Sequence, residues 1–421
     1  MEIAFATEAG VQPKNEDACQ AWPELGICVA CDGLATKQGG DLASRMAVEA
    51  IGRWAVANSG ILEAARQSKE KGPREQVQGL LFDAFQEVSK GIFQKSSSDP
   101  ALLGMCTTMD VLALLGSHAV IAHVGSGRVY LLRNEELHQL TEDHTQLAHM
   151  RRQGKLEGVT PAQQATFSKR LMRAVGFREE VQVDILGVEL EAGDRFFMVT
   201  DGVWSALGDT DFEKVAVSAG TPAALLKNLH AFVGPGKAKD NFTTLVLDPP
   251  KQVVSSGAAQ KIKMLGTVPA FSFLSYQELI RVINSGELVK VSGGKEIWKE
   301  GDKGGEMMLV LSGTVNIVKN GQQINVMNKG DVVGEMSMID NAPRSAAAVA
   351  ETPTNLLAFP RAALFELFRE EPDLAVKFLW GVTMEMNKRL RAVSNQLVGG
   401  TDKTAATPLS TGPLPFHRGK G

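Results

Sequence analysis

The chain has 421 residues and a formal net charge of −4, with 44% apolar and 22% charged residues. These values are ordinary for a globular protein of two or three domains and give a nucleic-acid-binding role no electrostatic support. No apolar run reaches the roughly 18 residues of a membrane span, and the first residues lack a signal sequence. We expect a cytoplasmic protein that binds neither nucleic acid nor membrane.

The first part of the chain, residues 1–248, mixes helical and strand-like hydrophobic spacing. Helices are expected at residues 41–56 and 75–95, and strands at residues 25–31, 109–115, 119–124, 128–132, 137–140, 195–200 and 243–247. The first strand is expected to end at the turn signal Asp32-Gly33. Because adjacent strands form hairpins, antiparallel sheets flanked by helices are favoured over a parallel doubly wound sheet.

The rest of the chain has a different pattern. Residues 249–264 read as a linker. Glycines then separate short strands, which is typical of an all-β barrel or jelly roll, and residues 361–397 are helical. We expect a second domain at residues 265–397 and a disordered tail at residues 398–421. The overall fold class is therefore α+β.

Cys28 and Cys31 form a C-x-x-C pair, a spacing found in zinc and redox sites. No second pair exists to complete a tetrahedral zinc site, and both residues lie in a predicted buried strand. We interpret them as small core residues.

Four aspartates stand at predicted strand ends or turns: Asp17, Asp32, Asp201 and Asp240. Each could simply occupy a turn. Carboxylates that converge, however, cannot all stay ionised without a cation between them, and hard oxygen ligands suit Mg²⁺ or Mn²⁺. The set therefore predicts a metal site.

Eight motifs in order resemble the PPM family, the type 2C metal-dependent protein phosphatases. The motifs are Asn15-Glu16-Asp17, Asp32-Gly33 with Gly40-Asp41-Leu42-Ala43-Ser44, Cys106-Thr107-Thr108, Gly125-x-x-Arg128-x-Tyr130, Leu140-Thr141-Glu142-Asp143-His144, Leu171-Met172-Arg173-Ala174-Val175-Gly176, Val199-Thr200-Asp201-Gly202-Val203-Trp204, and Asp240-Asn241. The resemblance implies an αββα sandwich and a protein serine/threonine phosphatase.

The resemblance also implies a site. Asp32 would bridge two Mn or Mg ions, the Gly33 carbonyl would be a further ligand, and Asp17, Asp201 and Asp240 would complete the shell. Asp32 and Asp201 are the expected catalytic residues. A water activated by the two metals would attack the phosphorus of a phosphoprotein substrate.

Three positions depart from the family pattern. Gln12 stands where bacterial members usually carry a phosphate-binding Arg, Ser126 where an Asp helps to hold a third metal, and Lys37 where a His is usual. Loss of a bidentate cation weakens phosphate binding. An inactive, phosphoprotein-binding form of the fold is therefore the alternative function.

Two histidines near these motifs are not expected to transfer protons. His123 lies in a predicted strand and reads as a packed core residue, and His144 is expected to order its loop.

The second domain carries Gly334-Glu335 and Pro343-Arg344-Ser345-Ala346. A glycine-led turn before a short helix can take an anion, Glu335 can bind ribose hydroxyls, and Arg344 can make a forked contact to phosphate. A purely structural ion pair between Glu335 and Arg344 is the alternative. Residues 271–397 resemble the cyclic-nucleotide-binding domain family, a β-roll with flanking helices.

This second resemblance implies that Gly334, Glu335, Arg344 and Ser345 bind cyclic AMP or cyclic GMP, which would regulate the phosphatase. Helices within residues 361–397 would move on binding. An amphipathic C-terminal helix can instead form a homodimer seam.

Overall fold

The computed structural model describes residues 1–421 except 69, 251–256, 341 and 398–421. The described chain divides into two compact units, one ending at residue 258 and one beginning at residue 259. The expected disordered tail and part of the expected linker lie outside the described residues. Helix α8 (Ala258–Thr267) occupies the last part of the expected linker, so that part is helical.

Two antiparallel sheets form the centre of the first unit. The first sheet has the strand order β1 (Glu2–Glu8), β11 (Phe242–Asp248), β10 (Arg195–Val199), β7 (Arg128–Arg133) and β8 (Glu136–Gln139). The second has the order β2 (Asp17–Trp22), β3 (Ile27–Leu34), β5 (Met109–Leu115), β6 (His118–Val124) and β9 (Asp184–Glu189), with β4 (Cys106–Thr107) beside β3.

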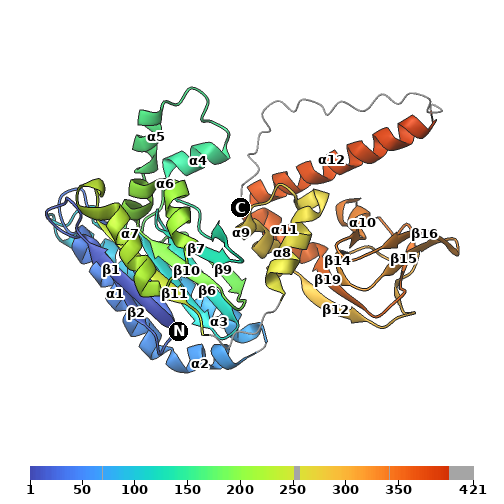
Figure 1. Cartoon of the computed structure of the whole chain (residues 1–421), viewed down its shortest axis with the longest axis horizontal. Helices are drawn as coiled ribbons and strands as arrows, with labels where there is room; N and C mark the ends of the chain where they lie inside the picture. Colours follow the sequence, from blue (N-terminus) through green and yellow to red (C-terminus); the bar gives the residue numbers. More distant parts are fainter. Residues whose placement is uncertain (69, 251–256, 341, 398–421) are drawn as a thin grey trace. The chain divides into compact units, whose positions relative to one another are not determined.

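Helices cover the outer face of each sheet (Figure 1). On the second sheet, α1 (Gly40–Ala57) and α3 (Gly72–Ser98) bury Ile51 and Phe85 against strand residues, with α2 (Ser59–Gln67) beside them. On the first sheet, α6 (Asp201–Ala216) and α7 (Pro222–Lys237) bury Phe212 and Leu229. The expected αββα sandwich is confirmed.

Two short helices, α4 (Gln146–Arg152) and α5 (Pro161–Ser168), form a hairpin that stands away from the sheets (Figure 1). An isolated bridge between Thr145 and Leu171 closes its base.

The prediction that the first strand ends at Asp32-Gly33 was wrong. β3 continues through both residues to Leu34, because Gly33 pairs with Thr107 of β4 and its N–H donates to the Glu16 carbonyl at 3.1 Å. Asp32 is therefore held by a sheet and not by a turn.

Cys28 and Cys31 are both buried in β3 and unpaired. Burial raises the pKa of each thiol above its ordinary value. This confirms their interpretation as core residues.

The second unit is a β-roll of two four-stranded sheets with helices around it. One sheet has the order β12 (Glu287–Val291), β19 (Thr354–Pro360), β14 (Glu306–Ser312) and β17 (Val332–Val333), and the other β13 (Glu296–Trp298), β18 (Ala347–Ala350), β15 (Val315–Lys319) and β16 (Gln322–Met327). The flanking helices are α8, the 3-10 helix η1 (Pro269–Phe271), α9 (Tyr276–Asn284), α10 (Glu335–Asp340), α11 (Arg361–Glu370) and α12 (Pro372–Leu397). The predicted β-roll with helices is confirmed.

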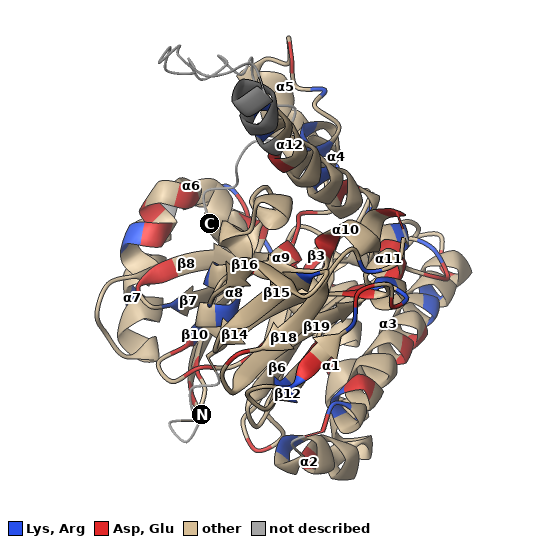
Figure 2. Ribbon diagram, turned by 90° about the vertical axis from the view of Figure 1, so that its right-hand side faces the viewer, with Lys and Arg blue, Asp and Glu red and all other residues tan. Residues whose placement is uncertain are grey.

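Charged residues of both signs are interspersed along the described helices (Figure 2). Among the described helices, none combines the length and the hydropathy of a membrane-spanning segment.

Candidate functional site

Asp17 and Asp32 lie directly opposite each other on the neighbouring antiparallel strands β2 and β3. Residues opposite each other in such a pair project from the same face. Oδ2 of Asp17 accepts hydrogen bonds from Thr200 Oγ1 at 2.8 Å and Thr243 Oγ1 at 2.7 Å. Its other oxygen, Oδ1, is buried and has no hydrogen-bond partner among the described residues. One carboxylate oxygen is thus left for another ligand.

The main chain around Asp32 is fixed from both sides. The Asp32 N–H donates to Thr108 Oγ1 at 2.9 Å, and its carbonyl accepts from Thr107 Oγ1 at 2.9 Å. A Cβ atom on Gly33 would lie 2.0 Å from the Gly40 carbonyl oxygen, so only glycine fits there. This packing fixes the main chain that carries the Asp32 carboxylate.

Asp201 and Asp240 reach the same region from the first sheet. Asp201 opens α6 directly after β10, and Asp240 precedes β11. The two loops touch, because a Cβ atom on Gly202 would lie 1.9 Å from the Asn241 carbonyl oxygen. The Asn241 side chain accepts from the Glu16 N–H at 2.7 Å, which ties these loops to the segment before Asp17.

Asp17, Asp32 and Asp201 are held in a buried setting, and the charge of the more exposed Asp240 acts on them. Burial raises the pKa of Asp17 to about 7, despite its two threonine donors. Burial and then the charge of Asp240 raise the pKa of Asp201 to about 6. Burial and then Asp17, Asp201 and Asp240 raise the pKa of Asp32 well above its ordinary value. Carboxyl groups with raised pKa values mark a place where positive charge is lacking.

Positive charge reaches this group of aspartates from Lys169 and, at Asp201, also from Arg128. Lys169, which follows α5, places Nζ 3.5 Å from Asp240 Oδ2, and its charge also lowers the pKa of Asp201. Among the described residues, no three Asp, Glu, His or Cys side chains form a ready-made metal shell. Besides carboxylates, main-chain oxygen and water are ligands that Mg²⁺ takes in proteins.

The structure shows the contacts of two residues that depart from the family pattern, Gln12 and Ser126. Gln12 is exposed and its Nε2 donates to the Lys239 carbonyl at 2.8 Å. Ser126 is buried, and its carbonyl accepts from Trp204 Nε1 at 3.0 Å.

Arg128 holds the first turn of α6, a role that the sequence analysis missed. Its guanidinium makes two hydrogen bonds to the Asp143 carboxylate, at 2.9 and 2.8 Å, and one to Asp209 at 2.9 Å. It also lies 3.9 Å from the ring centroid of Trp204, three residues after Asp201. The Arg128 and Trp204 motifs were visible in the sequence, but their contact was not.

His123 and His144 are buried and lie against each other, with ring centroids 4.5 Å apart. His123 Nδ1 is 2.6 Å from Asp110, and His144 Nδ1 accepts from the Gly125 N–H at 3.1 Å. Burial, and then the neighbouring His123, lowers the pKa of His144 to about 4. These contacts support the predicted roles in packing and loop ordering.

In the second unit, the structure brings Gly334 and Arg344 together. Gly334 has a φ of 81°, and its carbonyl accepts from Arg344 Nη1 at 3.3 Å. Within the described residues Arg344 forms no ion pair, so the alternative of a structural pair with Glu335 is not observed. Glu335 opens α10 and Ser345 is exposed.

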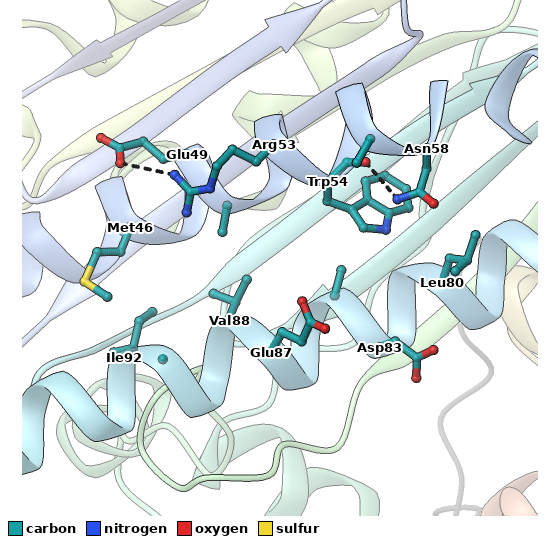
Figure 3. Close-up of a pocket in the computed structure, with 14 residues that line it drawn as sticks. Met46, Glu49, Arg53, Trp54, Asn58, Leu80, Asp83, Glu87, Val88 and Ile92 are labelled. Carbon is teal, nitrogen blue, oxygen red and sulfur yellow. Dashed lines mark hydrogen bonds and ion pairs between the residues drawn. The ribbon is translucent and has the colours of Figure 1, made fainter. Parts of the chain in front are cut away.

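A cavity that the structure describes lies elsewhere, between α1 and α3 (Figure 3). It has a volume of about 600 Å³ and contains none of the expected site residues. Its lining includes Met46, Arg53, Trp54, Leu80, Val88 and Ile92.

Comparison with known proteins agrees with this geometry. Residues 9–233 match the family model described as protein phosphatase 2C. The chain belongs to the protein phosphatase 2C family. Residues 288–371 match the model of the cyclic nucleotide-binding domain. Both resemblances are confirmed, as is the assignment to an enzyme family of serine/threonine protein phosphatases.

Individual relatives cover the first unit. The serine/threonine phosphatase stp of Listeria monocytogenes is 29% identical over 255 residues, which is 59% of this chain and 96% of that protein. The protein phosphatase PhpP of Streptococcus pneumoniae is 26% identical over 254 residues, 59% of this chain and 97% of that protein. A solved bacterial serine phosphatase has a TM-score of 0.52 at 23% identity, covering 58% of this chain and 96% of its own, which shows the shared fold.

The Arg128 contacts predict a large difference between two arginine variants. Arg128→Met should lower the free energy of unfolding by about 2–4 kcal/mol, because it leaves the Asp143 carboxylate without its cation. Arg53→Met is the control, since the Arg53–Glu49 pair is exposed and 3.8 Å apart, and should cost less than about 0.5 kcal/mol. Urea unfolding followed by circular dichroism measures both, and equal effects would contradict the assigned role.

Proposed function

We propose that the first unit hydrolyses phosphoserine and phosphothreonine in proteins, using two Mn or Mg ions. The buried Asp17 oxygen without a partner is the observation that carries the proposal. The raised pKa values of Asp17, Asp32 and Asp201 support it, since burial and neighbouring carboxylates raise all three, at Asp201 even against the charges of Lys169 and Arg128.

In this proposal Asp32 would help to hold both ions and the Gly33 carbonyl would be a further ligand, with Asp17, Asp201 and Asp240 completing the set. Divalent cations held there supply an activated water for attack on phosphorus and neutralise charge on the phosphoryl oxygens. The protein contributes fixed geometry: the two threonine hydroxyls orient Asp17, and the Arg128–Trp204 contact holds the turn that carries Asp201.

A phosphoprotein-binding module without turnover is the second candidate. Gln12 favours it, because its side chain is neutral and already bonded to the Lys239 carbonyl. Lys14, nearby in the sequence, is paired with Asp41. Substrate phosphate would then have fewer cations to bind it than in relatives with an arginine at this position.

If the first unit is an active phosphatase, we expect Mn²⁺-dependent turnover of a phosphothreonine peptide. Asp201→Asn should lower kcat/KM about a hundredfold or more, because a ligand of the proposed centre is lost. Asp211→Asn is the matched control on the same helix, since Asp211 is exposed and pairs with Lys214. It should keep the rate within about twofold.

Two outcomes separate the candidates. If wild type shows no turnover but binds Mn²⁺ in calorimetry, the binding module is favoured. If Mn²⁺ binding is also absent, the proposed metal centre is wrong.

We propose that the second unit binds cyclic AMP or cyclic GMP and that the nucleotide regulates the phosphatase. Gly334, Glu335, Arg344 and Ser345 form the proposed site. The buried guanidinium of Arg344, without a carboxylate partner among the described residues, is the supporting observation. A phosphodiester would supply the missing negative charge.

Regulation predicts a change in the phosphatase rate with saturating nucleotide. Typical coupling free energies correspond to a change of about fivefold or more. Arg344→Ala should remove this response and leave the rate without nucleotide unchanged. An equal rate with and without either nucleotide would contradict regulation while leaving the catalytic proposal intact.

We also propose a homodimer through α12. Val376, Leu379, Met386 and Leu390 are each at least 48% exposed, and their spacing follows the heptad pattern of a coiled-coil seam. The cytoplasmic location expected from the sequence stays a prediction.

The dimer predicts twice the 45.2 kDa chain mass in light scattering. Met386→Glu combined with Leu390→Glu should give a monomer, because charge is placed in the apolar seam. Lys388→Glu, which reverses a charge on the opposite side of the same helix, is the control and should remain dimeric. A monomeric wild type would refute the proposal.

A further inference from the structure

Arg344 is a buried cation held mainly by neutral groups. It is 5% exposed, and burial lowers its pKa despite the charges of Glu306 and Asp302. Nη1 donates to Ser337 Oγ at 2.8 Å, and Nη2 donates to the Glu306 carbonyl at 2.7 Å. Nε is buried without an acceptor among the described residues. The guanidinium therefore has unused capacity for an anion.

A tryptophan in strand β13 lies against the Arg344 guanidinium. The guanidinium carbon of Arg344 lies 3.9 Å from the ring centroid of Trp298 in β13. The indole is itself fixed, because Nε1 donates to the Ala346 carbonyl at 3.1 Å. The ring is thus bonded to the main chain two residues after the arginine that it covers.

The main chain of Arg344 is also anchored to the loop that follows β13. Its N–H donates to the Asp302 carbonyl at 2.8 Å, and its carbonyl accepts from the Gly301 N–H at 2.8 Å. Trp298 and this loop therefore hold both ends of the arginine, its main chain and its guanidinium.

We propose that Trp298 is a positioning residue for anion binding: its ring holds the Arg344 guanidinium in the orientation that receives the phosphate of a cyclic nucleotide. This inference rests on the proposed nucleotide-binding function of the second unit. An aromatic face attracts a guanidinium without neutralising its charge, so the cation stays available to the ligand. A carboxylate in the same position would compete with the phosphate.

An ordinary core role for Trp298 makes a different prediction. As core filling, its replacement would lower stability and leave the affinity of the folded protein unchanged. As a positioning residue, the aromatic face itself matters. Trp298→Phe keeps a ring, whereas Trp298→Leu and Trp298→Met keep an apolar side chain without one.

The experiment is calorimetric titration of the full chain with cyclic AMP and with cyclic GMP. Trp298→Leu and Trp298→Met should each weaken binding about tenfold, and Trp298→Phe should stay within about threefold of wild type. In an Arg344→Ala background, Trp298→Leu should have no further effect, because the two residues act as one unit. Thermal unfolding of each variant shows whether it folds. If one of Trp298→Leu and Trp298→Met does not fold, the other is used for the comparison.

The outcomes are distinct. If the wild type binds and both non-aromatic variants bind as tightly, the positioning role is wrong and the proposed function stands. If Trp298→Leu weakens binding equally with and without Arg344, Trp298 acts independently of the arginine and the inference is also wrong. If the wild type binds neither nucleotide, the proposed ligand class itself is refuted.

Discussion

The repulsion between Asp17 and Asp32 is the constraint on which the first unit depends. Their strands place the two carboxyl groups opposite each other in a buried setting, and burial makes ionisation of both unfavourable. Among the described residues, the fold gives neither Asp17 nor Asp32 an ion pair with an arginine or lysine. It binds one oxygen of Asp17 with two hydroxyl groups and leaves the other without a donor. Such an arrangement is stable only with a protonated carboxyl group or with bound cations.

Much of the first unit was predictable because its signals are local. The hairpin of β5 and β6 and the helices α1 and α3 follow from hydrophobic spacing over a few residues. The helices α6 and α7 were not predicted. Gly208 has a φ of 69° inside α6 and interrupts its helical pattern, and α7 contains Gly234 and Pro235. The extension of β3 past Asp32 depends on pairing with β4, a contact between distant segments that spacing does not reveal.

In the candidate sites too, residues within short sequence motifs could be predicted, whereas residues that contact them from distant parts of the chain could not. Asp17, Asp32, Asp201 and Asp240 were named from motifs, and the structure gathers them from both sheets. The residues that orient them were harder to find. Thr243 is 226 positions from Asp17. In the second unit, Trp298 contacts Arg344 from a different part of the chain, β13. Aromatic and hydroxyl groups of this kind are common, so their roles become visible only through contacts.

Each unit buries charge that its own side chains do not fully compensate, and the sign of that charge differs between the two units. One contains buried carboxylates with too little positive charge, and the other contains a buried guanidinium with no carboxylate partner among the described residues. In both, an arginine stacks on a tryptophan, Arg128 on Trp204 and Arg344 on Trp298. A ligand that supplies the missing charge binds the folded unit and not the unfolded chain, and therefore stabilises it. Stabilisation of each unit alone does not make one site control the other. Control requires that the nucleotide bind unequally to two arrangements of the chain that differ in phosphatase activity, so affinity and regulation must be measured as separate properties.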